Sequence, residues 1–247
     1  MIGKSFFPFD IKGEKDSYLF CFCHAGGNAN VFSKWIRNDS KIQLVPIEYP
    51  GHGGAYSENC RLDAKELAYD IAKEIDKLSI KSKVYFYGHS LGALVAFETA
   101  FIIRKDFKDI NIRKLIVSGR HAPHKEDPSE FKTTMGSRRL IEELRNIKAT
   151  DEVLLSNDAF VDYFIPIVMS DYKMNENYMY ENEVLDIPIE AHYGSEDNEA
   201  NLSHIKEWGN VTNADFKFKE FSGMHFFIFD EHNKYNEILY SIVENKW

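Results

Sequence analysis

The chain has 247 residues, of which 44% are hydrophobic and 28% charged, as in an ordinary globular protein with a sizeable core. Its formal net charge of −9 argues against a nucleic-acid partner, because phosphate binding needs clustered Lys and Arg. No apolar run approaches the roughly 18 residues that span a bilayer, and residues 1–10 lack the basic-then-apolar order of a signal peptide. We therefore expect one domain over 1–247, a monomer in the cytoplasm that binds neither nucleic acid nor membrane.

Short β-rich runs alternate with helical patterns along the chain, which is typical of a parallel sheet covered by helices. Residues 63–78 form an amphipathic helix that begins at Asp63, with Glu66 placed to complete a capping pair. Residues 91–103 are apolar almost all round, which indicates a helix packed against the centre of the sheet. The predicted strands are 18–23, 42–47, 84–87, 115–118, 189–193 and 216–221.

The stretch from about 121 to 186 breaks this alternation. It is long, rich in charge and helix formers, and lies between two predicted strands. We interpret it as a helical lid inserted into the domain. Met and aromatic residues within it could line an apolar substrate path, although the same spacing is typical of plain core; they are Met169, Tyr172, Met174, Tyr178 and Met179.

The segment 84–92 contains the pattern G-x-S-x-G at Gly88, Ser90 and Gly92, between a predicted strand and a predicted helix. In this context the pattern forms a nucleophile elbow, the sharp turn of an α/β-hydrolase fold that exposes a serine hydroxyl. The two glycines remove side chains that would clash in such a turn. The alternative is an incidental serine in a glycine-rich turn. We predict Ser90 as the nucleophile and an α/β-hydrolase fold with a mostly parallel sheet.

A serine hydroxyl needs a base, and histidine has the pKa that suits this role. Chain order in this fold is Ser, then acid, then His, so the base should follow the last strand. His225 does so. The acid should follow the preceding strand, where Glu196 and Asp197 stand side by side in a polar turn. We choose Asp197, with Glu196 as the alternative.

The tetrahedral intermediate of acyl transfer needs N–H donors for its developing negative oxygen. The backbone N–H of Leu91, directly after the nucleophile, is one predicted donor. The second should come from the loop after the first strand, and we predict Ala25 in the glycine-rich run 24–27. His24 in the same run has no partner at ligand spacing, so we expect it to be structural.

Taken together, these motifs resemble the stand-alone type II thioesterases that accompany nonribosomal peptide and polyketide synthases, which are kin to fatty-acid-synthase thioesterases. The resemblance covers essentially the whole chain. It rests on His-Ala-Gly-Gly at 24–27, Tyr-Pro-Gly-His-Gly at 49–53, Gly-His-Ser-Leu-Gly at 88–92, Ser-Gly-Arg at 118–120, Gly-Ser-Glu-Asp at 194–197 with Trp208 beyond it, and Gly-Met-His-Phe-Phe at 223–227.

The resemblance implies a function as well as a fold. It places the catalytic triad at Ser90, Asp197 and His225, the oxyanion hole at the backbone of Ala25 and Leu91, and so favours Asp197 over Glu196. It implies hydrolysis of acyl or aminoacyl thioesters on the phosphopantetheine arm of carrier domains, clearing stalled or mis-primed chains. The partner would be a synthase carrier domain, and no cofactor or metal is expected beyond the arm that the partner carries.

Three residues depart from the family pattern: Cys23 stands where proline is usual, His52 where arginine is common, and Met224 where a second glycine is common. None of these changes removes a predicted catalytic group. His52 puts in doubt a fixed positive charge at that position, and Met224 could narrow the site.

Net charge opposes the implied partner, because carrier domains of this kind are usually acidic, as this chain is. A local basic patch would have to offset the repulsion. Candidates near the lid are Arg120, Lys125, Arg138 and Arg139, although each taken singly is more simply an ordinary solvated charge.

Two other functions remain open from the sequence. A small-molecule carboxylesterase would use the same triad on free acyl esters and would be indifferent to a carrier. A non-catalytic binding module of the same fold would not react with a serine-directed fluorophosphonate, and the complete Ser-Asp-His set weighs against it.

Overall fold

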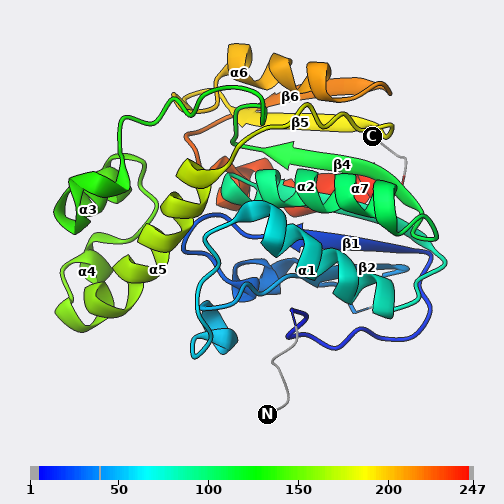
Figure 1. Ribbon diagram of the computed structural model, residues 1–247, viewed down its shortest axis with the longest axis horizontal. Coiled ribbons are helices and arrows are strands. Elements are labelled where there is room, and N and C mark those ends of the chain that lie inside the picture. The colour runs from blue at the N-terminus through cyan, green and yellow to red at the C-terminus, as the bar shows by residue number, and fades with distance from the viewer. Residues whose placement is uncertain (1–5, 39, 245–247) are drawn as a thin grey trace.

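The computed structural model describes residues 6–38 and 40–244. Residues 1–5, part of the segment considered above for a signal peptide, lie outside this range. Within it, six strands form one sheet in the order β2-β1-β3-β4-β5-β6, and every neighbouring pair is parallel (Figure 1). The strands are β1 Ser17–Phe22, β2 Ile42–Pro46, β3 Lys83–His89, β4 Ile112–Ser118, β5 Ile189–Gly194 and β6 Phe216–Phe221. The predicted parallel sheet of an α/β-hydrolase fold is confirmed.

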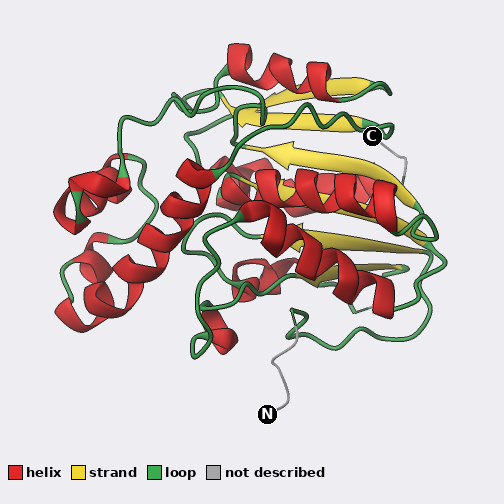
Figure 2. Ribbon diagram, in the orientation of Figure 1, coloured by secondary structure: helices red, strands yellow, loops and turns green. Residues whose placement is uncertain are grey.

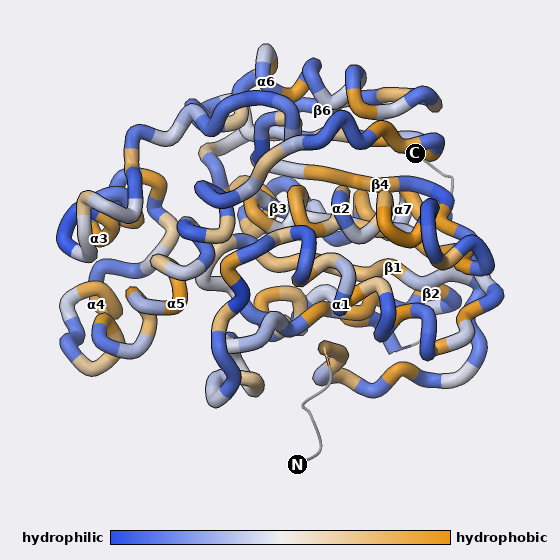
Figure 3. The backbone as a smooth tube through the Cα atoms, in the orientation of Figure 1, coloured by the Kyte–Doolittle hydropathy of each residue, from blue (hydrophilic) through white to orange (hydrophobic). Residues whose placement is uncertain are grey.

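Helices cover both faces of the sheet. In Figure 1, α1 (Ala64–Lys77) and α2 (Leu91–Asp106) lie in front of it and α7 (Tyr235–Val243) lies behind. Asp63 caps α1 as predicted, since its side chain accepts the N–H groups of Lys65 and Glu66. Figure 3 shows hydrophobic residues along α2 and the central strands, as burial on both sides requires. No helix in the described ranges is long and apolar enough to cross a membrane.

Shorter elements complete the α/β body. A short helix, α6 (Leu202–Lys206), packs beside β5 and β6. The 3-10 helices are η1 Ala29–Trp35, η2 Gly53–Ala55, η3 Thr133–Met135, η4 Glu207–Val211, η5 Phe227–Phe229 and η6 Glu231–Asn233.

The segment between β4 and β5 holds three further helices: α3 (Ser137–Asn146), α4 (Glu152–Leu155) and α5 (Asp158–Asn177). Figures 1 and 2 show them beside the carboxyl ends of the strands, away from α1 and α2. They share a small apolar cluster of their own, made of Phe131, Leu140, Leu144, Leu155, Ile165 and Val168. We call residues 121–186 the lid segment.

Parallel strands end at a common edge, and the loops after them meet there. The turns after β3, β5 and β6 carry Ser90, Asp197 and His225, and the loop after β1 carries Ala25. The fold therefore brings the predicted site residues to the edge that faces the lid segment.

Candidate active site

Ser90 lies in a strained turn between β3 and α2. Its backbone has φ 54° and ψ −122°, a conformation that non-glycine residues rarely adopt. Its N–H donates to the carbonyl of Ser118 at 2.9 Å. A Cβ at Gly88 would collide with the backbone of Gly92, and a Cβ at Gly92 would collide with the carbonyl of Phe22. The two glycines thus let β1, β3 and α2 approach closely enough to hold the serine in this turn.

His225 and Asp197 form a buried pair at the same edge. His225 Nδ1 lies 2.9 Å from Asp197 Oδ2, and the two residues are 4% and 5% exposed. Asp197 Oδ1 accepts the N–H groups of Glu199 and Ala200 at 3.0 and 3.1 Å. These bonds fix the carboxylate, which in turn orients the imidazole. Glu196, the alternative acid, is exposed and makes no side-chain bond to His225.

The pair perturbs both pKa values. Burial alone would lower the pKa of His225, but the hydrogen bond and charge of Asp197 outweigh it and raise that pKa above its usual value. Burial alone would raise the pKa of Asp197, but the bond from His225 and the two backbone N–H groups lower it. Asp197 is therefore ionised at neutral pH and stabilises a protonated His225, as a general base requires after it accepts a proton.

The predicted oxyanion hole would lie between the loop after β1 and the start of α2. Ala25 and Leu91 line the same pocket as Ser90. The loop is fixed by two bonds on either side of Ala25: the N–H of Gly27 donates to the carbonyl of His24 at 2.9 Å, and the N–H of Gly26 donates to Asp171 Oδ2 at 2.7 Å. The oxyanion role of Ala25 and Leu91 remains a prediction.

His24 packs against an aromatic side chain. Its ring lies against Phe226 at 5.0 Å between centroids, and its Nδ1 lies 3.0 Å from the carbonyl oxygen of Ala25. Burial lowers the pKa of His24 to about 4, so the ring is neutral at pH 7. This is consistent with the structural role expected from the sequence.

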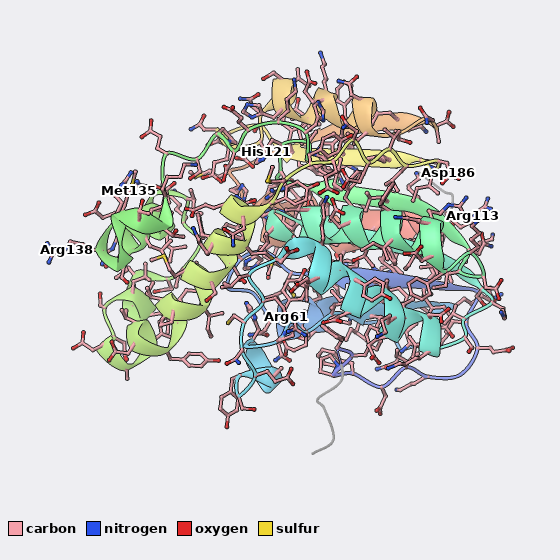
Figure 4. All side chains as sticks on the ribbon, viewed as in Figure 1. Arg61, Arg113, His121, Met135, Arg138 and Asp186 are labelled. Carbon is pink, nitrogen blue, oxygen red and sulfur yellow. The ribbon has the colours of Figure 1, made fainter. Side chains whose placement is uncertain are left out.

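The pocket that contains Ser90, hereafter the catalytic pocket, is small, with a volume of about 50 Å³ and a mixed polar and apolar lining. It is lined by Ala25, Ser90, Leu91, Gly119, Arg120, His121, Asp127, Ser129, Asp171, Tyr172, Asn175 and Glu199. Figure 4 shows His121 on the loop that leaves β4 for the lid segment.

The apolar substrate path considered from the sequence is not formed. Of its five candidates, only Tyr172 lines the catalytic pocket. Met174 is buried in the main core and Met179 is 75% exposed. Tyr178 donates its hydroxyl to Glu98 at 2.6 Å. Met174 thus serves packing and Tyr178 a buried hydrogen bond, which is the commoner use of such a pattern.

Asp171 is a residue of this pocket that sequence reasoning missed. It is fully buried on α5, in line with the buried residues Ile165, Val168 and Met174. A charged residue in an otherwise apolar helical stripe is the signal that could have identified it, because a buried charge needs a partner. Its partner is His52, whose Nε2 lies 2.9 Å from Asp171 Oδ2.

His52 is paired with a buried carboxylate at the position where a fixed cation was in doubt. Burial alone would lower its pKa, but the charge and hydrogen bond of Asp171 outweigh burial and raise that pKa. The second ring nitrogen, Nδ1, lies 3.0 Å from the carbonyl oxygen of Pro50. The pair joins the lid segment to the loop after β2.

The suggested basic patch does not form as a unit. Arg120 is only 7% exposed, and its Nη2 donates to Asn175 Oδ1 at 2.5 Å inside the catalytic pocket. Lys125 pairs with Glu207 at 3.0 Å, and Arg139 pairs with Glu142 at 3.4 Å. Figure 4 shows Arg138 at the outer end of α3, pointing away from the body.

Comparison with known proteins decides the family. The family model of the thioesterase domain matches residues 17–246. The chain belongs to the thioesterase domain family. Thioesterase PikA5 of Streptomyces venezuelae is 32% identical to this thioesterase. The match covers 89% of this thioesterase and 79% of PikA5. Gramicidin S biosynthesis protein GrsT of Aneurinibacillus migulanus is 30% identical over 96% and 92% of the two chains.

A solved structure extends the likeness to three dimensions. The RedJ thioesterase from the prodiginine biosynthetic pathway of Streptomyces coelicolor superposes with a TM-score of 0.83 at 26% identity, covering 96% of this thioesterase and 91% of RedJ. The resemblance inferred from the motifs is confirmed, and the chain is a hydrolase that acts on thioesters.

Proposed function

We propose that this thioesterase hydrolyses acyl and aminoacyl thioesters from the phosphopantetheine arm of carrier domains, and so clears stalled or mis-primed chains in nonribosomal peptide or polyketide biosynthesis. The observation that carries the proposal is the buried His225–Asp197 pair at the strand edge where Ser90 stands in its strained turn. Near full-length similarity to GrsT and RedJ, proteins of two biosynthetic pathways, supports the synthase context.

The proposed reaction has two halves. In the first, Ser90 Oγ attacks the thioester carbonyl while His225 accepts its proton, and the negative oxygen is held by the N–H groups of Ala25 and Leu91. Each such donor is typically worth about 3 to 4 kcal/mol of barrier. The C–S bond then breaks, and the pantetheine sulfur leaves with the proton from His225.

In the second half, His225 takes a proton from water as the water oxygen attacks the acyl-Ser90 ester. The free acid departs, and the proton returns to Ser90. A thiol has a pKa near 8.5, so it leaves more easily than an alkoxide or an amine, and the site asks little of its general acid. No cofactor takes part in this proposal, since the arm belongs to the carrier domain.

The proposed setting is the cytoplasm, where the protein acts as a monomer on carrier domains of a synthase. The lid segment lies beside the catalytic pocket, so the arm must enter along it. Because the chain carries a net charge of −9, electrostatic attraction to an acidic carrier would have to be local.

The test is release of free acid from an acyl-phosphopantetheinyl carrier protein, with the free acyl ester at equal concentration as the comparison. Wild type and Ser90→Ala are assayed side by side. Fast, Ser90-dependent hydrolysis that favours the carrier thioester supports the proposal. Equal or better turnover of the free ester identifies a carboxylesterase, and no Ser90-dependent turnover of either substrate leaves only a binding module.

A further inference from the structure

One carboxylate oxygen in the catalytic pocket has no partner. Asp171 Oδ2 accepts two hydrogen bonds, from the N–H of Gly26 at 2.7 Å and from His52 Nε2 at 2.9 Å. Asp171 Oδ1 is buried and meets no donor among the described residues. Leaving a buried acceptor unpaired is costly, and such atoms in a pocket are positions where a ligand can supply the missing donor.

The rest of the pocket lining carries more acidic than basic groups, and its one guanidinium, Arg120, holds a buried Nε without a partner among the described residues. Asp127, Asp171 and Glu199 contribute three carboxylates, against one guanidinium from Arg120. Asp127 accepts from the Asn175 amide and the Ser129 N–H. Because the lining holds more acid than base, it suits an acyl group with a positive charge better than a neutral alkyl chain.

The position of Asp171 relative to the proposed reaction centre indicates which group of a substrate could reach it. Asp171 bonds the N–H of Gly26, the residue next to Ala25, whose N–H is the proposed donor to the thioester oxygen. The substrate carbonyl would therefore lie close to Asp171. In an aminoacyl thioester the α-nitrogen is attached to the carbon next to this carbonyl, so it lies within reach of a group beside the oxyanion hole.

We propose that Asp171 is a specificity-determining residue whose Oδ1 binds the α-ammonium group of an aminoacyl thioester. This rests on the proposed function and names the substrate class within it: short aminoacyl groups in preference to acyl groups of the same length without the amine. His52 and Gly26 both donate to Oδ2, and the ammonium group donates to the oxygen that they leave free.

The experiment compares three acyl groups of equal size on one carrier protein: alanyl, lactyl and propionyl. They differ only in an α-ammonium, an α-hydroxyl or an α-hydrogen. We measure kcat/KM for wild type, Asp171→Asn and Asp162→Asn. Asp162 lies on the exposed side of the same helix, so its variant repeats the chemical change away from the pocket.

A charge-assisted hydrogen bond in a buried site corresponds to roughly ten- to hundredfold in rate. We expect wild type to prefer alanyl over propionyl by about this factor, with lactyl close to propionyl. Asp171→Asn should lose most of the preference, and Asp162→Asn should retain it. Each ratio is internal to one variant, so a general loss of activity in Asp171→Asn does not imitate a loss of selectivity.

Other outcomes overturn the proposal in separable ways. Equal turnover of alanyl and propionyl carriers by wild type removes ammonium recognition but leaves the proposed function intact. Equal turnover of lactyl and alanyl removes recognition of charge, and an unchanged ratio in Asp171→Asn removes the assignment to Asp171. No Ser90-dependent turnover of any of the three overturns the proposed function as well.

If Asp171→Asn does not fold, wild type alone still tests whether the pocket recognises the ammonium group. Non-hydrolysable analogues in which a methylene replaces the thioester sulfur are compared as inhibitors in alanyl and propionyl forms. Tighter inhibition by the alanyl form, by the same factor, supports the proposal, and equal inhibition overturns it.

Discussion

Replacing Asp197 with asparagine tests the His225–Asp197 pair directly. Asparagine keeps the size of the side chain and can still accept backbone N–H groups, but it removes the negative charge 2.9 Å from His225 Nδ1. In enzymes with this arrangement, the equivalent change lowers kcat by about 10⁴, because the imidazole loses its tautomer and its protonated form loses its counter-ion. We expect a loss of about 10³- to 10⁴-fold here.

The same variant should shift the pH profile, and the structure gives the sign. His225 acts as a base only when neutral, so kcat/KM falls as the pH drops through the pKa of His225. Asp197 raises that pKa against the effect of burial. Removing the Asp197 charge leaves burial opposed by the weaker attraction of Glu199, whose Oε2 lies 4.0 Å from His225 Nδ1, so the acid limb of the profile should move to lower pH.

Stopped-flow or continuous thiol-release assays from pH 5 to 9 measure both quantities. Glu196→Gln is the matched control, because Glu196 is the neighbouring acid and is exposed. It should retain the rate and the profile of wild type. A variant Asp197→Asn within tenfold of wild type, or one whose acid limb stays in place, would refute the assignment of Asp197 as the partner of His225.

Two further predictions concern stability, and each has an internal reference. Gly92→Ala places a Cβ against the backbone carbonyl of Phe22, so it should lower the free energy of unfolding by at least about 2 kcal/mol. Gly54→Ala adds a Cβ with no neighbouring atom within 4 Å, so it should change this free energy by less than about 0.5 kcal/mol. Urea titrations measure both values. Equal effects of the two would show that the close approach at Gly92 is unimportant. Glu98 is 1% exposed and burial raises its pKa to about 7, above the unfolded value of about 4.5, so wild type loses stability as the pH rises from about 4.5 to 7. The amide side chain introduced by Glu98→Gln does not titrate. The free energy of unfolding of this variant should therefore rise by about 2 to 3 kcal/mol relative to that of wild type between pH 5 and pH 8. Parallel pH dependence of the two free energies would contradict the raised pKa of Glu98.

The parts of the fold that follow from local pattern were predictable. β3, the Gly88–Ser90–Gly92 turn and α2 are consecutive in the chain, and the turn requires residues without side chains on both sides of the serine. His225 followed from chain order in this fold. The choice between Glu196 and Asp197 did not follow from spacing. The two residues are adjacent in a polar turn, and spacing does not say which of the two side chains points toward His225.

The lid segment could not be predicted in detail because its contacts are distant in the sequence. Asp171 meets His52 and Gly26 across 119 and 145 residues, and no local pattern encodes that pairing. Arg120 looked like a surface cation, but it lies buried against Asn175, which is 55 residues further along the chain. Periodicity identifies which face of α5 is buried, but not which loop it packs against.

The most direct measurement is covalent labelling with a fluorophosphonate, with the adduct located by peptide mass spectrometry. If Ser90 is the nucleophile activated by His225, wild type should carry one adduct, on Ser90, while Ser90→Ala should carry none and His225→Ala should label far more slowly. A label on another serine, or equal labelling of Ser90→Ala, would contradict Ser90 as the nucleophile.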